Sequence, residues 1–428
     1  MSEMRRKLEL SMWLLFFGLM VFLCFNLNSK NTFDNYHDPI WSDAGGYYIY
    51  LPTTFIYGWE GYGVPETWPD KLGNGFELTD KGTVKTKYSV GVAIMEAPFF
   101  LIAHLFAIIN DHGDGYSFEY HIGLWFAGVF YLVLGLFFLK EYLIKRYDLK
   151  SVLTTLVLIL VGTNLYYYGL NSVGMSHIYS FFLFATTLWL SDVIIEKKRT
   201  RHLVLFSFLA GLIVIVRPTG CLYLIFLMVL SPQLFSTLFL DLFKRPFIAL
   251  ILLIAFLVPL LPQFIYWKFL TGNFFHYAYT GETFDWLKPE LLKFWFSTNN
   301  GLFVYAPILL FSILGVVVLF KENRKQAIQY ILFFLLISYV FSSWWCWWYG
   351  CSYGSRNFVE YLVPASIPFC LFVQRTFTSR FTSVKYFLFG AAVFFIFINL
   401  KIIYKYDDCF YGANNELWDW STYYKLIF

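Results

Sequence analysis

The chain has 428 residues, of which 58% are hydrophobic and 14% are charged, and its formal net charge is only +4. Soluble globular domains carry about 25% charged residues, so this composition excludes an ordinary soluble protein and favours one embedded in a membrane. No basic tract interleaved with aromatic residues points to a nucleic-acid partner.

The first apolar segment is Leu8–Phe25, and it follows a basic cluster at the N-terminus. No small-residue cleavage site follows it, so we expect a retained signal-anchor rather than a cleaved signal peptide. Residues 27–118 would then form a long external segment. Within that segment Val90–Ile109 is apolar enough for a span. A crossing there would place the basic loop after residue 139 outside, so we expect an interfacial helix, which also suits Glu96, Pro98 and His104.

Ten further apolar runs follow, several of them near the length of about 20 residues that crosses a hydrocarbon core of about 30 Å. They are Ile122–Leu139, Val152–Tyr167, Ile178–Ile195, Leu203–Val216, Cys221–Leu230, Phe247–Trp267, Phe303–Phe320, Ile328–Phe341, Phe358–Val373 and Tyr386–Ile403. We therefore expect an all-α polytopic membrane protein with about 11 transmembrane helices and additional interfacial helices. No linker or repeat divides the chain, which predicts a single domain over residues 1–428.

The connections between these runs alternate in charge. Short connections rich in Lys and Arg recur at Lys140–Lys150, Glu196–His202, Phe243–Arg245, Lys321–Lys325 and Arg375–Lys385. The positive-inside rule assigns these to the cytoplasm, together with the N-terminus. Residues 27–118, the loop 268–302 with its own interfacial helix, and the tail 404–428 then lie outside. In a bacterial inner membrane the outside is the periplasm.

The first acidic candidate is Asp43, within the segment 40–48 that reads IWSDAGGYY directly after the first span. A carboxylate at this boundary can reach water and still lie beside lipid. Ser42 or Asp43 acting as a helix N-cap is the structural alternative. Asp38 is a second catalytic candidate or a helper of Asp43. With His37, Asp38 offers two adjacent ligands for a possible divalent cation, which is a weak metal signal.

Three basic residues on the expected outer face are candidates for binding an anion. Arg217 ends an apolar run, where a buried guanidinium requires a counter-charge; an Arg that snorkels to the interface is the alternative. Arg356 ends the segment 347–356, WWYGCSYGSR, in which Trp348 and Tyr353 are candidates for stacking on a sugar. An aromatic belt is the alternative for these tryptophans. Lys87 precedes the expected interfacial helix, where an exposed lysine without function is the alternative.

His177 and Glu360 each open an expected span on the outer side. Ionisable residues within spans default to functional hypotheses, although neighbouring helices often satisfy a buried histidine. Cys346, Cys351 and Cys409 also fall on the outer side, where a disulfide is permitted; we expect core or interfacial cysteines instead.

Taken together, these motifs resemble the GT-C superfamily of integral membrane glycosyltransferases, of the protein mannosyltransferase and aminoarabinose transferase kind. The resemblance rests on the carboxylate in the first outer loop, Lys87-Tyr88 before an interfacial helix, Arg217-Pro218 after a mid-chain span, and the late WWYGCSYGSR segment. It implies that Asp43 is catalytic and that Lys87, Arg217 and Arg356 hold the donor phosphate. Relatives with paired acidic residues in the first loop differ from this chain, which has only Asp38 near Asp43.

The resemblance implies an inverting transfer of a sugar from a polyprenyl-phosphate donor to an acceptor at the periplasmic face. The acceptor is a lipid, a glycan or a protein, and membrane lipids surround the site. A lipid-linked glycan flippase, transporter or polysaccharide polymerase is the alternative function. Transporters tend to place charged or broken-helix features at the midplane, whereas the polar residues here gather at the expected outer boundary.

Overall fold

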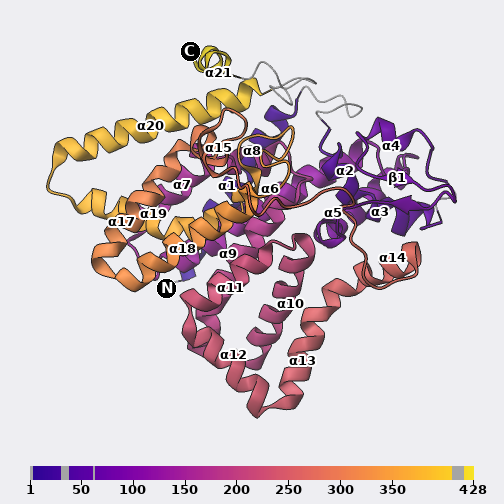
Figure 1. Ribbon diagram of the computed structural model, residues 1–428, viewed down its shortest axis with the longest axis horizontal. Coiled ribbons are helices and arrows are strands. Elements are labelled where there is room, and N and C mark those ends of the chain that lie inside the picture. The colour runs from indigo at the N-terminus through magenta and orange to yellow at the C-terminus, as the bar shows by residue number, and fades with distance from the viewer. Residues whose placement is uncertain (1–2, 30–37, 61–62, 407–418) are drawn as a thin grey trace.

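The computed structural model describes residues 3–29, 38–60, 63–406 and 419–428 (Figure 1). It is mostly helical, as the sequence predicts for an all-α membrane protein. Within the described residues the only sheet is a two-stranded antiparallel one, in which β1 (Glu77–Leu78) pairs with β2 (Val84–Lys85).

The helices of the first half are α1 (Glu3–Leu27), α2 (Asp43–Tyr48), α3 (Tyr50–Pro52), a π-helical turn (Thr53–Tyr57), α4 (Trp68–Lys71), α5 (Gly91–Ile109), α6 (Phe118–Leu143), α7 (Leu149–Gly162), α8 (Leu165–Leu170), α9 (Ser176–Lys197) and α10 (Thr200–Val216). Those of the second half are α11 (Gly220–Leu230), α12 (Pro232–Lys244), α13 (Pro246–Leu257), α14 (Leu261–Thr271), α15 (Leu291–Phe296), α16 (Leu302–Tyr305), α17 (Leu310–Glu322), α18 (Arg324–Ser342), α19 (Leu362–Thr378), α20 (Thr382–Lys405) and α21 (Trp420–Ile427). Three 3-10 turns lie at Val258–Leu260, Pro307–Leu309 and Arg356–Phe358.

Seven helical stretches in the described part of the chain are long and apolar enough to cross a membrane, or eight if one bent pair is a single span. Six of the seven correspond to expected spans: α1, α6, α9, the continuous stretch Pro246–Thr271, α18 and α20. The seventh is α5. The structure therefore supports a membrane protein with several spans, and it does not reproduce the count of eleven.

The remaining expected spans correspond to helices that are too short to qualify as spans or that are broken. α7 and α10 are apolar but shorter than a full crossing, and α11 and α12 meet at a bend of 98°. The run Phe303–Phe320 is divided into α16, a 3-10 turn that starts at Pro307, and α17. Proline cannot donate the backbone hydrogen bond that continues a helix, so apolar composition overestimated the length of this segment.

Helix α5 covers the segment that we expected in the interface, and by length and composition it also qualifies as a span. One of the polar residues behind that expectation is placed differently from what we assumed. Glu96 is only 1% exposed and accepts a hydrogen bond from Tyr179 of α9 (2.8 Å). It faces other helices rather than lipid headgroups, so this part of the reasoning is wrong. The interfacial position of α5 stays a prediction.

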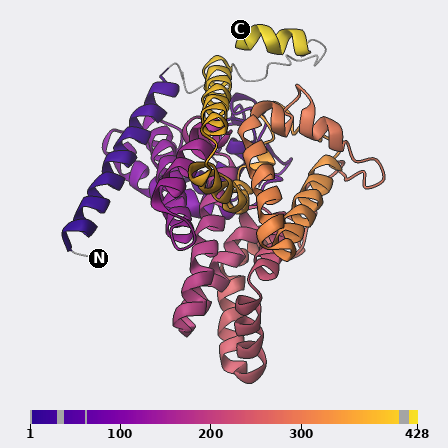
Figure 2. The ribbon, with the colours of Figure 1, turned by 90° about the vertical axis from the view of Figure 1, so that its left-hand side faces the viewer.

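The loop 268–302 contains one short helix of its own after α14 ends at Thr271, the six-residue α15, while Phe284 forms an isolated β-bridge with Trp344. The interfacial position of α15 stays a prediction. Figures 1 and 2 show α10–α13 extending away from the rest of the bundle, and α20 and α21 lying along another side.

Ion pairs link several of the basic connections to neighbouring helices. Arg146, just after α6, pairs with Asp192 of α9 (2.7 Å), and Lys140 of α6 bonds to Glu9 near the start of α1. A further ion pair joins the ends of α17 and α19. At their opposite ends, α9 begins at Ser176 and α10 ends at Val216, directly before Arg217. Ser176 and Arg217 therefore lie a helix length away from the basic connection between α9 and α10.

Candidate functional site

Asp43 is the first residue of α2, and the backbone around it is unusual. Ser42 has φ 53° and ψ −119°, a conformation that a non-glycine residue adopts only when its surroundings impose it. Hydrogen bonds from Ser42 N to Leu72 O (2.8 Å) and from Gly46 N to Ser42 O (3.0 Å) hold it there. The Ser42 side chain makes no capping bond, so the structure does not support the serine N-cap alternative.

The glycines after Asp43 let α2 lie directly against the segment that precedes α5. A Cβ added to Gly46 would lie 2.3 Å from the carbonyl oxygen of Gly75 and 2.1 Å from the Tyr88 ring. Thr86 Oγ1 also donates to Gly46 O (2.9 Å). This close approach carries Tyr88 to the Asp43 carboxylate.

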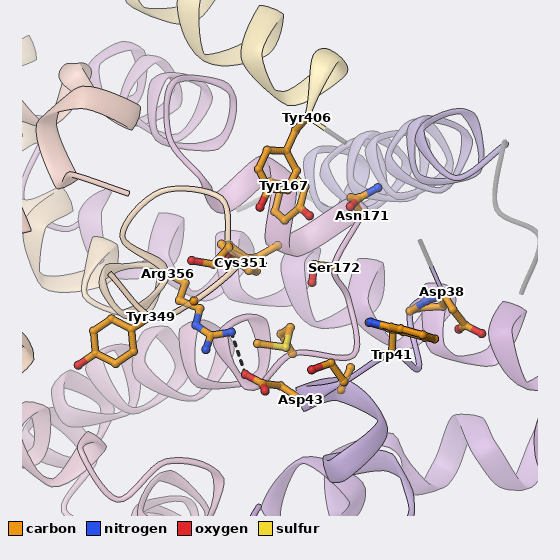
Figure 3. Close-up of a pocket in the computed structure, with 17 residues that line it drawn as sticks. Asp38, Trp41, Asp43, Tyr167, Asn171, Ser172, Tyr349, Cys351, Arg356 and Tyr406 are labelled. Atoms are coloured by element: carbon orange, nitrogen blue, oxygen red, sulfur yellow. Dashed lines mark ion pairs between the residues drawn. The ribbon is translucent and has the colours of Figure 1, made fainter. Parts of the chain in front are cut away.

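Both oxygens of the Asp43 carboxylate are bonded. Arg356 Nη1 lies 2.9 Å from Asp43 Oδ2 (Figure 3), and the Tyr88 hydroxyl donates to Oδ1. Burial opposes ionisation of Asp43, but Arg356, the Tyr88 hydrogen bond and Lys87 outweigh it, so the pKa of the Asp43 carboxyl lies below its usual value. Burial and the neighbouring carboxylate raise the pKa of the Tyr88 phenol well above its usual value, so Tyr88 remains the donor.

Arg356 is positioned by the turn that precedes it. Tyr349 (φ 58°) and Gly350 (φ 68°) both have left-handed backbone conformations. Asn300 fixes this turn, because its Nδ2 donates to Trp348 O (2.8 Å) and to Ser352 Oγ (2.8 Å). The spacing of glycines in the sequence therefore corresponds to a real tight turn, and the turn directs Arg356 toward Asp43.

Arg217 follows α10 and is held by a polar network. Its Nε lies 3.1 Å from Glu360 Oε1, and its Nη2 donates to Asn357 Oδ1 (2.7 Å). Its Nη1 donates to Ser176 Oγ (3.2 Å) at the start of α9. His177 Nδ1 contacts the other Glu360 oxygen (3.1 Å). The guanidinium is thus fixed in place by Glu360 and Asn357 rather than snorkelling freely.

Lys87 faces the loop 268–302. Its Nζ lies 2.5 Å from Glu282 Oε1 and 5.5 Å from the centre of the Tyr279 ring. Its side chain is 39% exposed, so this ion pair is screened by solvent. Lys87 is therefore engaged by an acidic residue of the chain, which the sequence did not indicate.

Two cavities meet at the Asp43–Arg356 pair. The first, which we call the cationic cavity, has a volume of about 520 Å³ and is lined by Lys87, Arg217 and Arg356 together with Asp43 and aromatic residues of the loop 268–302. The second, which we call the polar cavity, has a volume of about 390 Å³ and is lined by Trp41, Asn171 and Ser172 among others. Asp43, Arg356 and Tyr349 line both.

Asp38 was expected to act with Asp43, and its side chain is engaged elsewhere. It lies in the wall of the polar cavity but is only 1% exposed, with Oδ2 bonded to His121 Nε2 (2.9 Å) and Oδ1 accepting from Ile40 N (2.7 Å). Figure 3 shows Asp38 beyond Trp41, with its carboxylate directed away from Arg356. These bonds fit a residue that orders the segment before Asp43 better than a second base.

The aromatic candidates Tyr353 and Trp348 do not line either cavity. Tyr353 is fully buried and donates to Asn399 Oδ1 (2.9 Å), which ties the turn to α20. Trp348 packs edge-on against Trp347. His177 and Glu360 are also absent from the cavity walls; Glu360 pairs with Arg217, and His177 contacts Glu360. These four residues are therefore not placed to contact a ligand directly in this structure.

The metal and disulfide expectations have different outcomes. No group of three or more His, Cys, Asp or Glu side chains that could hold a metal occurs in the part of the chain that was described. Both Asp43 oxygens are bonded to Arg356 and Tyr88. Cys351 is disulfide-bonded and Cys346 is free, so the expectation of no disulfide at Cys351 is wrong. His37 and Cys409 lie outside the described residues.

Sequence reasoning missed three residues that complete the site. Tyr88 donates to Asp43, Glu282 pairs with Lys87, and Asn357 bonds Arg217. Their partners are 45, 195 and 140 residues away in the chain. Only the position of Tyr88 directly after Lys87 was a usable signal.

No family model matches the sequence, and no curated protein or solved structure was found to be similar to it.

Proposed function

We propose that this protein is a membrane glycosyltransferase that moves a sugar from a polyprenyl-phosphate donor to an acceptor hydroxyl. The observation that carries the proposal is the meeting of two cavities at one carboxylate. Asp43 lines both, and Lys87 and Arg217 line only one of them. A transferase needs a separate space for each substrate and a reactive group between them. Both volumes lie within the range of roughly 300–1,000 Å³ that small-molecule sites occupy.

The cationic cavity suits the phosphate of the donor. Arg217 and Arg356 are always charged and present planar sets of donors that match phosphate oxygens. The buried Nδ2 of Asn357 makes no well-aligned hydrogen bond within the described chain and adds a further donor beside Arg217. Trp344, Trp345 and Phe284 line the same cavity and offer an apolar surface to the isoprenoid chain.

In the proposed reaction the acceptor oxygen attacks the anomeric carbon from the side opposite the phosphate. The new carbon–oxygen bond forms as the bond between the sugar and the phosphate oxygen breaks, which inverts the anomeric configuration. Asp43 takes the proton of the acceptor hydroxyl as general base. The phosphate leaves with the electron pair of the broken bond, and Arg217, Arg356 and Lys87 stabilise its charge.

The Asp43–Arg356 contact links donor binding to the base. With no donor present, Arg356 keeps the carboxyl ionised and weakly basic. A donor phosphate beside Arg356 competes for the same guanidinium. As the guanidinium turns to the phosphate, the pKa of Asp43 rises and the carboxylate becomes a better proton acceptor.

The bundle supports an outer position for the site. Several basic connections lie together at one end, and Ser176 and Arg217 lie at the other ends of α9 and α10. The positive-inside rule then assigns the cavities to the outer leaflet, which for a bacterial inner membrane means the periplasmic face with a cytoplasmic N-terminus. The C-terminal tail would be periplasmic.

The decisive variant is Asp43→Asn, which keeps the shape of the side chain and removes the base. We expect loss of sugar transfer with unchanged membrane insertion and unchanged binding of polyprenyl phosphate. Asp192→Asn at the opposite end of the bundle is the matched control, because Asp192 pairs with Arg146 far from both cavities. Wild-type transfer by Asp43→Asn would refute the catalytic role.

A further inference from the structure

The polar cavity differs in charge from its neighbour across Asp43. Among the described residues of its wall, Arg356 is the only cation, and Arg356 is already paired with Asp43. The cationic cavity has Lys87 and Arg217 in addition. An acceptor carrying a phosphate or carboxylate next to its reacting hydroxyl would therefore meet one cation on the described wall of the polar cavity, against three on that of the cationic cavity. The cavity favours a neutral group.

Several polar atoms on the wall have no hydrogen-bond partner among the described residues. The Ser42 and Ser172 hydroxyls and the Trp41 indole N–H line the polar cavity and make no hydrogen bond to any described residue. A hydroxyl both donates and accepts, and an indole N–H only donates. Figure 3 shows Ser172 between Trp41 and the pair formed by Tyr167 and Tyr406.

Aromatic rings form much of the remaining wall. Tyr167 and Tyr406 lie edge-on to each other with ring centroids 5.3 Å apart, and Trp41 lies on another side of the cavity. The ring of a pyranose presents apolar C–H groups on its faces and hydroxyls around its edge. Aromatic faces attract the positively polarised hydrogens of such C–H groups. The Ser42 and Ser172 hydroxyls and the Trp41 indole N–H suit hydrogen bonds to the hydroxyls at the edge of the sugar ring.

The backbone around the cavity is held in strained conformations at two places. Ser42 and Tyr349 both have positive φ, and both line the polar cavity. Strain of this kind gathers at ligand sites. It fixes the direction of Asp43 on one side and of Arg356 on the other. The polar cavity is therefore a preformed site and not an incidental gap in packing.

We infer that the polar cavity binds the acceptor and that the acceptor is a neutral carbohydrate, whose hydroxyl points to Asp43. This inference rests on the proposed transfer reaction and specifies its second substrate. A protein acceptor would present an extended peptide, and extended peptides bind to a sheet edge or along a groove. A compact cavity of about 390 Å³ offers neither.

The test uses the full chain in lipid nanodiscs and a panel of neutral methyl disaccharides observed by saturation-transfer NMR. A Ser/Thr-containing peptide and a phosphorylated lipid headgroup analogue are the competing probes. Ser172→Leu fills the polar cavity without touching the cationic one. Ser383→Leu, on the exposed start of α20, is the matched control. Binding of polyprenyl phosphate is measured on every variant.

We expect at least one neutral disaccharide to bind, Ser172→Leu to weaken that binding by about tenfold or more, and Ser383→Leu to leave it unchanged. Binding of polyprenyl phosphate should be the same in all three proteins. If only the peptide or the phosphorylated analogue binds in a manner sensitive to Ser172→Leu, the acceptor assignment is overturned while the proposed transfer stands. If polyprenyl phosphate itself fails to bind, the proposed function falls and the acceptor assignment falls with it.

Discussion

The contact between Arg356 and Asp43 allows a quantitative prediction. At a separation of 2.9 Å and an effective dielectric constant of about 20, the attraction between the two charges is on the order of 5 kcal/mol before screening. The side chains are 18% and 26% exposed, so solvent reduces this value. An arginine beside an aspartate lowers the pKa of the carboxyl by about 1–3 units. We therefore expect Arg356→Gln to raise the pKa of Asp43 by about one to two units.

The direction of the effect on activity follows from the role of the base. In the wild type the lowered pKa keeps Asp43 ionised at neutral pH, and activity should fall only as pH drops below the ordinary value of about 3.9. In Arg356→Gln the carboxyl takes up its proton at higher pH, so the acid limb of the kcat/KM profile should move upward. Loss of one donor to the leaving phosphate should also lower kcat by roughly 10²–10³.

The assay is the pH dependence of sugar transfer by wild type and Arg356→Gln at constant ionic strength. Arg375→Gln is the control, because Arg375 forms an exposed pair with Glu322 at the opposite end of the bundle. Such surface pairs contribute about 0–1 kcal/mol, and its profile should match the wild type. An acid limb that does not move in Arg356→Gln would refute the electrostatic coupling between Arg356 and Asp43.

Three further variants test other contacts. Tyr88→Phe removes the hydrogen bond to Asp43 and should also raise the pKa of the carboxyl; a pH profile with an unmoved acid limb would contradict this. Glu282→Gln releases Lys87 and should tighten polyprenyl-phosphate binding several-fold at low salt, as titration calorimetry can measure; weaker binding would refute competition between Glu282 and the phosphate. Arg217→Ala leaves Glu360 buried without its counter-charge and should destabilise the fold by about 3–5 kcal/mol, visible as a lower Tm, whereas Arg217→Ala combined with Glu360→Gln should recover most of that loss.

Much of the site follows from local chemistry in the sequence. Asp43, Arg217 and Arg356 each occur where a charge beside an apolar run requires a partner, and the structure brings their side chains to the walls of shared cavities. The glycines after Trp348 indicated a turn, and Gly350 has the positive φ that such a turn requires. The need for a counter-charge or for a turn is set by neighbouring residues, so it can be predicted from the sequence without knowing the fold.

Other features depend on contacts between distant segments. Glu282 meets Lys87 across 195 residues, and nothing near either residue indicates the pairing. Tyr353 lies three residues before Arg356, yet it points to Asn399 and away from the cavities. A short motif marks a turn, but the surrounding helices decide which of its side chains reaches a ligand.

The span count shows a comparable limit. Hydropathy measures composition and does not register the 98° bend between α11 and α12 or the break at Pro307. Hydropathy equally gives no sign that Glu96 of α5 is buried against Tyr179 of α9. The basic connections were more informative. Lys145 and Arg146, in the connection after α6, form ion pairs with Glu196 and Asp192 near the end of α9.

The most direct test is a structure of the full chain with a polyprenyl phosphate bound. The account predicts phosphate density in the cationic cavity, within hydrogen-bond distance of Arg217 or Arg356, with the isoprenoid chain along Trp344 and Trp345. A phosphate bound at the end of the bundle that carries Arg146 and Asp192 would contradict it, since no acceptor at Asp43 would then meet the donor.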